Sequence, residues 1–339
     1  MRLSDLVRDQ APDPREDATG RRPALSSLLF DTKDSLGENV SSLREADAHV
    51  AWYGAARKEI TAIGEAVRAN RGVTFDRCHR LAEDLVTMLA TSDDLILRMM
   101  REDVEAYQVS NAIHVAILSV KIGQGLRYDS AALERLALAG LLHDLGMWLV
   151  PQEIVEKSGS LNADEWSGIH AHPEQGRRVV AEMGESFHWL ATAIAQEHER
   201  WDGSGYPCRL KGGAIVEVAQ IIGLADVLDA MMSPRPYHAR VAPHQALRSL
   251  LVQYKQAFQP RLIKTLVDQL SLYPIGTSVR LNDGHIGIVS KVNSRYPLRP
   301  VLLVQRNREG QTNGEAAAVD LCRETSMHIV EVLPETRAA

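Results

Sequence analysis

The sequence predicts a mainly α-helical protein: a helical bundle with extra N-terminal helices and a small β-rich appendage at its C-terminal end. Aromatic residues make up only 5% of the chain, and the abundant alanine and leucine favour helices. Apolar residues recur at the spacing of a helix from about residue 40 to about residue 270. After Tyr273 and Pro274 the pattern changes to short apolar runs separated by turn residues, as in strands.

Length and composition narrow the class of protein. A chain of 339 residues has room for two or three domains and a sizeable core. A hydrophobic content of 45% with 24% charged residues is typical of a globular protein. The net charge of −6 argues against bulk nucleic-acid binding, although a local basic pocket stays open. Three widely spaced cysteines indicate neither a disulfide framework nor a cysteine zinc site. No membrane span or signal peptide is visible, so we expect a cytoplasmic protein.

The N-terminal part is expected to hold a flexible arm and a helical region. Residues 1–38 are polar and interrupted by prolines and glycines, which indicates an arm without fixed structure. Residues 39–104 predict a long helix over about 40–70, a second over about 75–90 and a third from about 93. The first helix has an apolar stripe made of Val50, Tyr53, Ile60, Ile63 and Val67. We expect these helices to cover the core; the alternatives are that they pair two subunits into a homodimer or receive a signal.

Residues 105–272 are expected to form the functional helical domain. Asn162 and Glu165 make a capping pair, and Pro173 suits the first turn of a helix. The glycines and the proline of residues 200–207 require a loop. The predicted helices lie at about 105–126, 130–145, 162–169, 173 onward, 187–199, 216–232, 243–257 and 260–270.

Residues 273–335 are expected to form the small β-rich domain. A strand over Thr277–Leu281, a tight turn at residues 282–284 and a strand over His285–Val292 predict a hairpin. Two more strands are predicted over 300–305 and 327–332. This region contains no visible catalytic constellation.

The central motif is the stretch Leu141-Leu142-His143-Asp144-Leu145-Gly146. It lies at the predicted C-terminal end of a helix, with leucines on both sides of the histidine and the aspartate. Burying an imidazole and a carboxylate is costly unless something satisfies them, and both groups are ligands of first-row metal ions. For this dipeptide alone, a His–Asp hydrogen bond that caps the helix end is the alternative interpretation.

Further possible ligands follow at regular intervals along the chain. His114, His143, His172, His198 and Asp226 are separated by 29, 29, 26 and 28 residues, each interval being about one helix and its connection. Five successive helices could therefore bring their ligands to one centre, as in the di-metal sites inside helix bundles. The candidate metal ligands are His114, His143, Asp144, His172, Glu197, His198 and Asp226.

Four motifs, taken in order, resemble the HD-GYP domain. They are His143-Asp144-Leu145-Gly146, then His172-Pro173-Glu174-Gln175-Gly176, then His-Glu-Arg-Trp-Asp-Gly-Ser-Gly-Tyr-Pro over residues 198–207, and Ala225-Asp226-Val227-Leu228-Asp229-Ala230. The resemblance covers roughly residues 105–260. It implies an all-helical, bacterial, metal-dependent phosphodiesterase of the HD superfamily, which opens cyclic di-GMP to linear pGpG and in some members cuts on to GMP.

The resemblance also implies roles for single residues. Asp144 would bridge two metal ions and, with His143, form the catalytic centre. Glu197 stands where the family usually has a histidine, and a carboxylate favours hard or borderline ions, so Fe or Mn is expected, with Ni, Co and Zn as alternatives. Ser110 stands where some members have a glutamate for a third metal, so two ions are expected. The implied substrate-binding residues are Gly205, Tyr206, Pro207, Arg235 and His238.

Two acidic residues would support the ligands from behind. Glu199 and Asp229 are expected to orient His198 and Asp226, and a salt bridge at a helix end is the alternative for either. In the two-metal template, ions roughly 3.5–4 Å apart lower the pKa of a bridging water, and the resulting hydroxide attacks the phosphorus in line.

Two departures from the family pattern bear on activity, both at positions where the family has lysine. Met147 replaces the lysine after the His-Asp motif, and His238 replaces the lysine that follows Arg235. Each charged contact to phosphate is worth on the order of 1.5–3 kcal/mol. Losing both could therefore weaken substrate binding or catalysis by more than tenfold.

Three hypotheses about function follow. The first is a cyclic di-GMP phosphodiesterase with a di-metal centre. The second is a signalling adaptor or sensor that binds metal and the nucleotide but turns over slowly or not at all, as Met147 and His238 would favour. The third is a metal phosphohydrolase that acts on another nucleotide or phosphoester. The loop at residues 203–207 could close over substrate or dock a partner, such as a diguanylate cyclase with a GGDEF domain.

Overall fold

The structure is a computed structural model that describes residues 35–92, 95–96, 99, 107–157, 159–233, 241, 243–270, 273, 276–293, 296, 299–306 and 312–333. The chain divides into two compact units, Met1–Asp47 and Ala48–Ala339. Residues 1–34 of the predicted arm lie outside the described residues. Most of the helix predicted from about residue 93 also lies outside them. The domain limits predicted after residues 38, 104 and 272 stay predictions.

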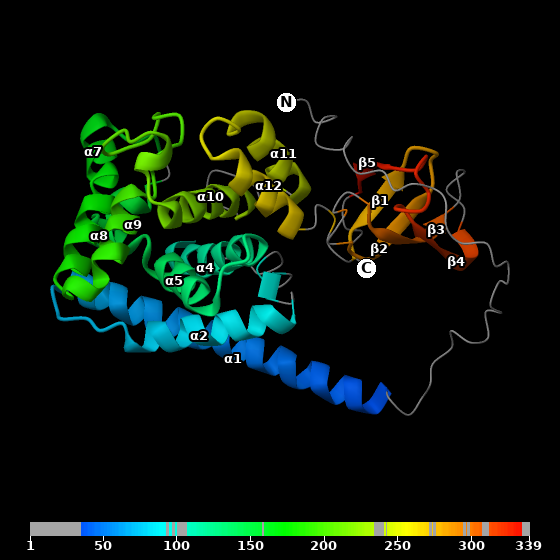
Figure 1. Cartoon of the computed structure of the whole chain (residues 1–339), viewed down its shortest axis with the longest axis horizontal. Coiled ribbons are helices and arrows are strands. Elements are labelled where there is room, and N and C mark those ends of the chain that lie inside the picture. Colours follow the sequence, from blue (N-terminus) through cyan, green and yellow to red (C-terminus); the bar gives the residue numbers. More distant parts are fainter. Residues whose placement is uncertain are drawn as a thin grey trace. The chain divides into compact units, whose positions relative to one another are not determined.

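The fold is mainly helical, as the sequence predicts (Figure 1). The first helices are α1 (Ser35–Arg68) and α2 (Asp76–Thr91). The following helices are α4 (Tyr107–Gly125), α5 (Ser130–Leu142), α6 (Gln152–Val155), α7 (Ala163–His170), α8 (His172–Ala181), α9 (His188–Gln196), α10 (Glu217–Met232), α11 (Pro243–Gln253) and α12 (Pro260–Gln269). Short 3-10 helices occur at η2 (Leu145–Leu149), η3 (Glu185–Phe187) and η4 (Gly212–Ala214).

Helix α4 lies at the centre of the helical domain. Every residue from Val109 to Gly123 is buried, and α4 packs against α2, α5, α10 and α12. A helix that is apolar on all sides is expected in such a position. Its buried polar residues therefore need partners within the core.

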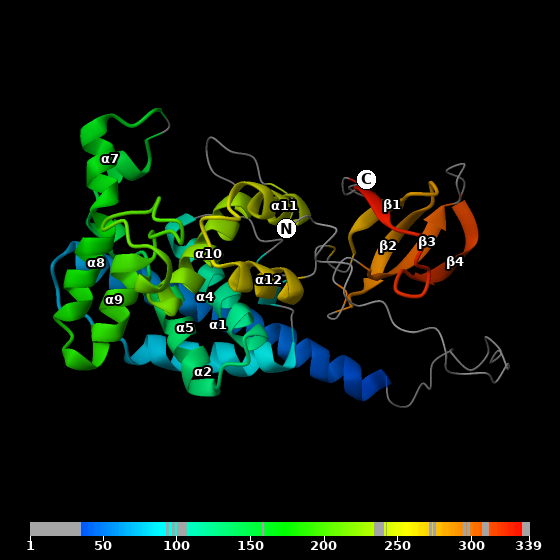
Figure 2. The same ribbon diagram turned by 45° about the horizontal axis from the view of Figure 1, so that its top comes forward.

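The N-terminal helices cover one side of this core, which is the predicted role. Figures 1 and 2 show α1 and α2 side by side along the edge of the bundle, next to α4 and α5. Tyr53, Ile60, Ile63 and Val67 of the predicted stripe are buried. Val50 is 50% exposed, so it lies off that stripe.

Local sequence signals set several helix ends. Asn162 and Glu165 form the predicted capping box at the start of α7, and Pro173 occupies the first turn of α8. Helix α5 ends at Leu142, earlier than predicted, and the chain enters η2 after His143 and Asp144. The central pair therefore lies in the junction between two helices.

The C-terminal domain is an antiparallel sheet with strand order β4-β3-β2-β1-β5. Its own small core contains Val279, Leu281, Val289, Leu302 and Leu321. The strands are β1 (Ser278–Leu281), β2 (Ile286–Lys291), β3 (Val301–Arg306), β4 (Thr312–Asp320) and β5 (Ile329–Val332). Strand β4 was absent from the prediction, because its sequence begins with polar residues and glycine and continues with alanine, which are poor strand signals.

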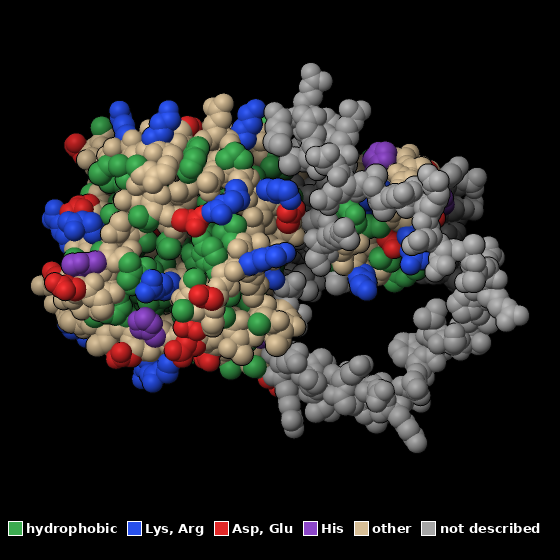
Figure 3. Space-filling view, in the orientation of Figure 1, with side chains coloured by type: hydrophobic (Ala, Val, Ile, Leu, Met, Phe, Trp, Pro, Cys, Tyr) green, Lys and Arg blue, Asp and Glu red, His purple; other side chains and the backbone are tan. Residues whose placement is uncertain are grey.

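Two surface properties bear on possible partners. On the face drawn in Figure 3, basic and acidic side chains are interspersed over the helical domain. Within the described residues, no helix is both long and apolar enough to cross a membrane.

Candidate metal centre

Four of the predicted ligands meet in one cluster. Asp144, His172, Glu197 and His198 each place a donor atom within 4.8 Å of the others. Asp144 comes from the junction between α5 and η2, His172 from the start of α8, and the other two directly follow α9. Residues distant in sequence thus converge because three helix ends meet at one point.

The distances within the cluster suit a shared cation. His172 Nε2 lies 3.0 Å from His198 Nε2, 3.2 Å from Asp144 Oδ1 and 3.4 Å from Glu197 Oε1. His198 Nε2 lies 3.9 Å from the same Glu197 oxygen. Two imidazole nitrogens and two carboxylates facing one another are the donor set of first-row metal ions.

Backbone carbonyls fix the tautomers of two histidines. His172 Nδ1 lies 2.7 Å from the carbonyl oxygen of Ile169, and His143 Nδ1 lies 2.8 Å from that of Gly140. A carbonyl only accepts, so each Nδ1 carries the hydrogen and each Nε2 presents a lone pair. This is how metal-binding histidines are commonly oriented.

Several buried polar atoms around the cluster make no hydrogen bond. Within the described residues these include Nε2 of His143 and both carboxylate oxygens of Glu197. The amide oxygen of Asn111 is likewise buried and makes no hydrogen bond with a described residue. Leaving such atoms unpaired costs roughly 1–3 kcal/mol each, and a bound cation would give the nitrogen and the carboxylate a partner. The residues therefore fit a metal centre.

The protonation properties of the cluster point the same way. Burial raises the pKa of Glu197 well above its ordinary value and raises the pKa of Asp226. Burial also lowers the pKa of His198 far below its ordinary value, which keeps its imidazole neutral. Burial acts to lower the pKa of His143, but the carboxylates of Glu197, Asp144 and Asp226 outweigh it and raise that pKa. The site thus collects carboxylates that resist ionising together, a conflict that a cation relieves.

Asp226 lies beside the cluster and is held from behind. Asn111 Nδ2 donates to Asp226 Oδ1 at 3.1 Å and to Asp229 Oδ2 at 2.9 Å. Asp229 was expected to orient Asp226, and the structure links the two through the Asn111 amide. Sequence reasoning missed Asn111, although a polar residue inside the apolar run of α4 was the available signal.

His114 is not brought to the cluster. Its Nδ1 lies 2.7 Å from Asp229 Oδ1 and its Nε2 lies 2.6 Å from the hydroxyl of Tyr53. Both ring nitrogens therefore have hydrogen-bond partners in this structure, and the ligand role of His114 stays a prediction. The residue that faces Asp226 is Asn111, one turn earlier on α4.

Glu199 also has a different partner from the one predicted. Its Oε1 accepts from the backbone N–H of Cys208 at 2.6 Å, and its Oε2 accepts from that of Leu210 at 2.8 Å. The carboxylate therefore closes the loop that follows α9, whereas a role in orienting His198 was expected. The backbone donors of the loop satisfy a side chain that is only 2% exposed.

The predicted substrate loop covers one ligand. The ring of Tyr206 stacks on His198, with centroids 4.7 Å apart, and on the other side on His170 at 4.1 Å. The Tyr206–Pro207 peptide bond is cis. A Cβ at Gly205 would collide with the backbone of His198 to Arg200, so only glycine allows the loop to pass this close.

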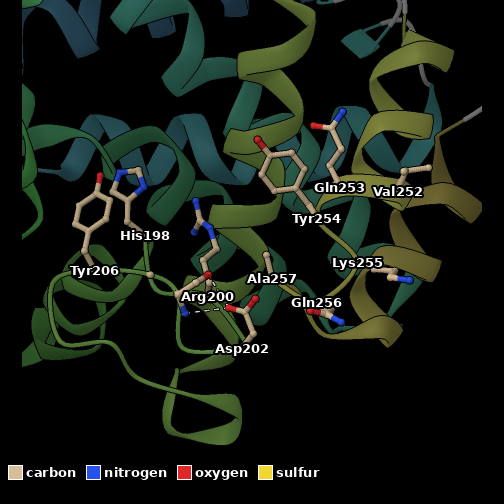
Figure 4. Close-up of a pocket in the computed structure, with 12 residues that line it drawn as sticks. His198, Arg200, Asp202, Tyr206, Val252, Gln253, Tyr254, Lys255, Gln256 and Ala257 are labelled. Carbon is tan, nitrogen blue, oxygen red and sulfur yellow. Dashed lines mark hydrogen bonds between the residues drawn. The ribbon is translucent and has the colours of Figure 1, made fainter. Parts of the chain in front are cut away.

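A pocket of about 540 Å³ opens next to His198. The loop contributes Arg200 and Tyr206, and the segment after α11 contributes Tyr254 and Lys255. In Figure 4 the rings of His198 and Tyr206 lie together at one side, with Tyr254 across from them. The predicted phosphate contacts Arg235 and His238 lie outside the described residues.

Comparison with known proteins agrees with this centre. Residues 85–262, more than half of the chain, match the family model described as HD domain. The chain belongs to the HD domain family. Residues 278–339 match a model described as KOW domain associated with HD domain. The predicted resemblance is confirmed, because the relatives support an HD-GYP-type domain.

The relatives carry related names. A cyclic di-GMP phosphodiesterase of Pseudomonas aeruginosa is 29% identical over 75% of this chain and 62% of its own length. The cyclic di-GMP phosphodiesterase response regulator RpfG of Xanthomonas campestris is 35% identical over 45% of this chain and 40% of its own. The 3'3'-cGAMP-specific phosphodiesterase 2 of Vibrio cholerae is 30% identical over 59% of this chain and 38% of its own. The chain thus spans less than two thirds of each relative.

A solved structure shows the same fold. It is the HDG"Y"P protein from Bdellovibrio bacteriovorus, with a TM-score of 0.54 over 70% of this chain and 80% of that one. The two sequences are 17% identical in the match, so the likeness concerns the fold alone.

Proposed function

We propose that this protein is a metal-dependent phosphodiesterase that hydrolyses cyclic di-GMP to linear pGpG, with GMP as a further product. The observation that carries the proposal is the cluster of Asp144, His172, Glu197 and His198, of which His172 and Glu197 are buried and whose donor atoms lie within 4.8 Å of one another. The names of the relatives support cyclic dinucleotides as the substrate class.

The proposed ligands divide into the cluster and its neighbours. Asp144, His172, Glu197 and His198 would hold one ion, and His143 and Asp226, together with Asp144, would hold a second. The carboxylates favour Mn or Fe, with Ni, Co and Zn as alternatives. Ions bound there would supply an activated water for in-line attack on phosphorus and would neutralise charge on the phosphoryl oxygens.

The chain's own residues would position the substrate. A cavity of about 540 Å³ is in the range of small-molecule sites, and we assign one nucleoside of the substrate to it. Tyr254 offers a ring for stacking on a base, and Lys255 offers a cation for phosphate. Tyr206 covers His198 and would limit the access of bulk water. Arg235 and His238 stay proposed phosphate contacts.

One assay tests the function. The chain is purified with Mn or Fe, its metal content per chain is measured, and cyclic di-GMP is followed by chromatography. Metal binding with hydrolysis supports the proposal. His172→Ala should abolish both, whereas His188→Ala, which removes an exposed histidine outside the cluster, should change neither. A metal-loaded chain that leaves cyclic di-GMP intact but hydrolyses other phosphoesters contradicts the proposed substrate and favours the broader phosphohydrolase.

A second candidate function is that of a slow or inactive signalling adaptor. Its supporting observation is Met147, whose backbone N–H donates to the carbonyl of Asp144 at 2.9 Å. A residue at this position lies one turn from a cluster ligand, and methionine cannot pair with phosphate there. Metal and nucleotide binding without turnover in the same assay would favour this candidate.

We also propose a setting for either function. The protein would act in the cytoplasm, dock signalling proteins such as diguanylate cyclases through the loop at residues 203–207, and form homodimers through its N-terminal helices. Size-exclusion chromatography with light scattering tests the dimer, and a monomer at micromolar concentration contradicts it.

A further inference from the structure

A continuous row of buried hydrogen bonds connects the N-terminal helix to the metal centre. The Tyr53 hydroxyl of α1 lies 2.6 Å from His114 Nε2, and His114 Nδ1 lies 2.7 Å from Asp229 Oδ1. Asn111 Nδ2 then connects Asp229 to Asp226 at 2.9 and 3.1 Å. The first four of these side chains are at most 2% exposed.

The two carboxylates fix the positions of several hydrogens in this row. The Asp229 carboxylate only accepts, so His114 Nδ1 must donate to it. The other ring nitrogen, Nε2, is hydrogen-bonded to the Tyr53 hydroxyl. Asn111 faces two carboxylates, so its NH₂ group and not its oxygen must point at them.

This arrangement holds Asp226 from behind. One hydrogen of the Asn111 amide goes to Asp226 Oδ1, which fixes the rotation of that carboxylate. The other goes to Asp229, whose position depends on His114. Asp229 Oδ1 also accepts from the Ser233 hydroxyl at 2.9 Å. Each side chain in the row is therefore oriented by the next one. Tyr53 is the member of the row that lies on α1.

We propose that Tyr53 and His114 are positioning residues that orient Asp226 for a divalent cation, so that helix α1 contributes to metal affinity. The proposal rests on the function proposed above. It differs from a packing role, because its effect passes through Asp226 and must appear in cation binding. Outer groups that orient metal ligands typically change affinity by roughly 10–100-fold when removed. His114 is three hydrogen bonds away from Asp226 and Tyr53 is four, so we expect the lower end of this range, about tenfold, for either.

The chain offers a matched control on the same helix. Trp52 is buried beside Tyr53 and donates from Nε1 to the Leu81 carbonyl at 3.0 Å, away from the row. Tyr53→Phe and Trp52→Phe each remove one buried donor of α1. Both should lower the melting temperature of the EDTA-treated chain. Only Tyr53→Phe should weaken binding of Mn²⁺, by about tenfold in a calorimetric titration with the metal alone.

Two variants of His114 test the same proposal even if Tyr53→Phe fails to fold. His114→Gln keeps one donor and one acceptor and should retain most of the Mn²⁺ affinity, whereas His114→Leu should lose it. Equal Mn²⁺ affinity in wild type and Tyr53→Phe, or an equal loss in Trp52→Phe, overturns the positioning role. Equal Mn²⁺ affinity in His114→Gln and His114→Leu also overturns the positioning role. A wild-type chain that binds no Mn²⁺ overturns the proposed function itself.

Discussion

The environment of Glu197 in the candidate metal centre can be tested without metal, by measuring how the replacement of Glu197 by glutamine changes the stability of the chain. The Glu197 side chain is 1% exposed, and neither of its oxygens accepts a hydrogen bond from a described residue. Burial raises the pKa of Glu197 well above the ordinary 4.5. The metal-free chain must therefore either ionise a buried carboxyl or keep a proton on it, and both cost stability.

The sign of the pH dependence follows from proton binding. Above pH 4.5 the unfolded chain loses the Glu197 proton while the folded chain keeps it. The free energy of unfolding of the metal-free chain therefore falls as the pH rises towards the folded pKa. The cost at pH 7 cannot exceed about 3.4 kcal/mol, which is 2.5 pH units at 1.36 kcal/mol each.

Glutamine removes the titration but not the burial. Its amide also lacks partners, which costs roughly 1–3 kcal/mol at every pH. The absolute stability of Glu197→Gln could thus move either way at one pH. Its stability relative to wild type should increase from pH 5 to pH 8, because only the wild type carries the cost of Glu197, which grows with pH, whereas the cost of Asp226 is present in both chains. The pH trend is therefore the diagnostic quantity.

Urea unfolding in EDTA at a series of pH values measures this trend. Glu199→Gln is the matched control at pH 7, since Glu199 is equally buried but accepts two backbone hydrogen bonds. That control should lose stability by roughly 1.5–3 kcal/mol. Added Mn²⁺ should raise the melting temperature of wild type but not of Glu197→Gln. If the stability difference between Glu197→Gln and wild type stays constant from pH 5 to pH 8, burial does not raise the pKa of Glu197, and the reasoning is refuted.

Three further perturbations address other parts of the molecule. Met147→Lys should raise the rate of cyclic di-GMP hydrolysis by on the order of tenfold, since a lysine there can pair with phosphate; an unchanged rate removes the missing lysine as a cause of weak activity. In a native thiol titration at pH 8, Cys78 should stay unmodified because burial raises its pKa to about 12, while the exposed Cys208 reacts; reaction of both before unfolding contradicts this. Gly223→Ala would push a Cβ into the carbonyl of a cluster ligand and should weaken Mn²⁺ binding severalfold, whereas Gly213→Ala meets no atom within 4 Å and should not.

The helical fold could be predicted because its signals are local. The apolar stripe of α1, the capping box at Asn162 and the proline at position 173 each act within a few residues. The strand pattern after Tyr273 is local too. Strand β4 escaped prediction because pairing with β3, and not its own composition, makes it a strand.

The helices that surround the site could be predicted from the sequence. Which residue along each helix faces the site could not. The interval count pointed to α4, which lies next to the site through the contact of Asn111 with Asp226, and it selected His114. Three residues along a helix correspond to roughly 4.5 Å of rise, and this distance separates His114 from Asn111. Which of the two reaches Asp226 depends on how α4 and α10 pack, which the spacing of residues does not contain.

The true partner of His114 was equally invisible in the sequence. Tyr53 lies 61 residues away and was assigned to an apolar stripe, where its hydroxyl has no evident role. A tyrosine in such a stripe is usually core, and here the ring is indeed buried. Its hydroxyl nonetheless satisfies the one histidine nitrogen that would otherwise be free for a metal. Tertiary packing therefore gives the predicted ligand two hydrogen-bond partners of its own, Tyr53 and Asp229.

The glycines of the sequence motifs explain how the cluster keeps unpaired donors close together. A Cβ at Gly146 would collide with the carbonyl of His172, one at Gly205 with that of His198, and one at Gly223 with that of Glu197. Three of the four cluster ligands thus have their backbone in contact with a glycine from another segment. Backbone-to-backbone contact leaves little room for the ligands to move apart and satisfy their donors elsewhere. The folded chain therefore bears the cost of assembling the site in advance, and a cation that binds there has less ordering left to do.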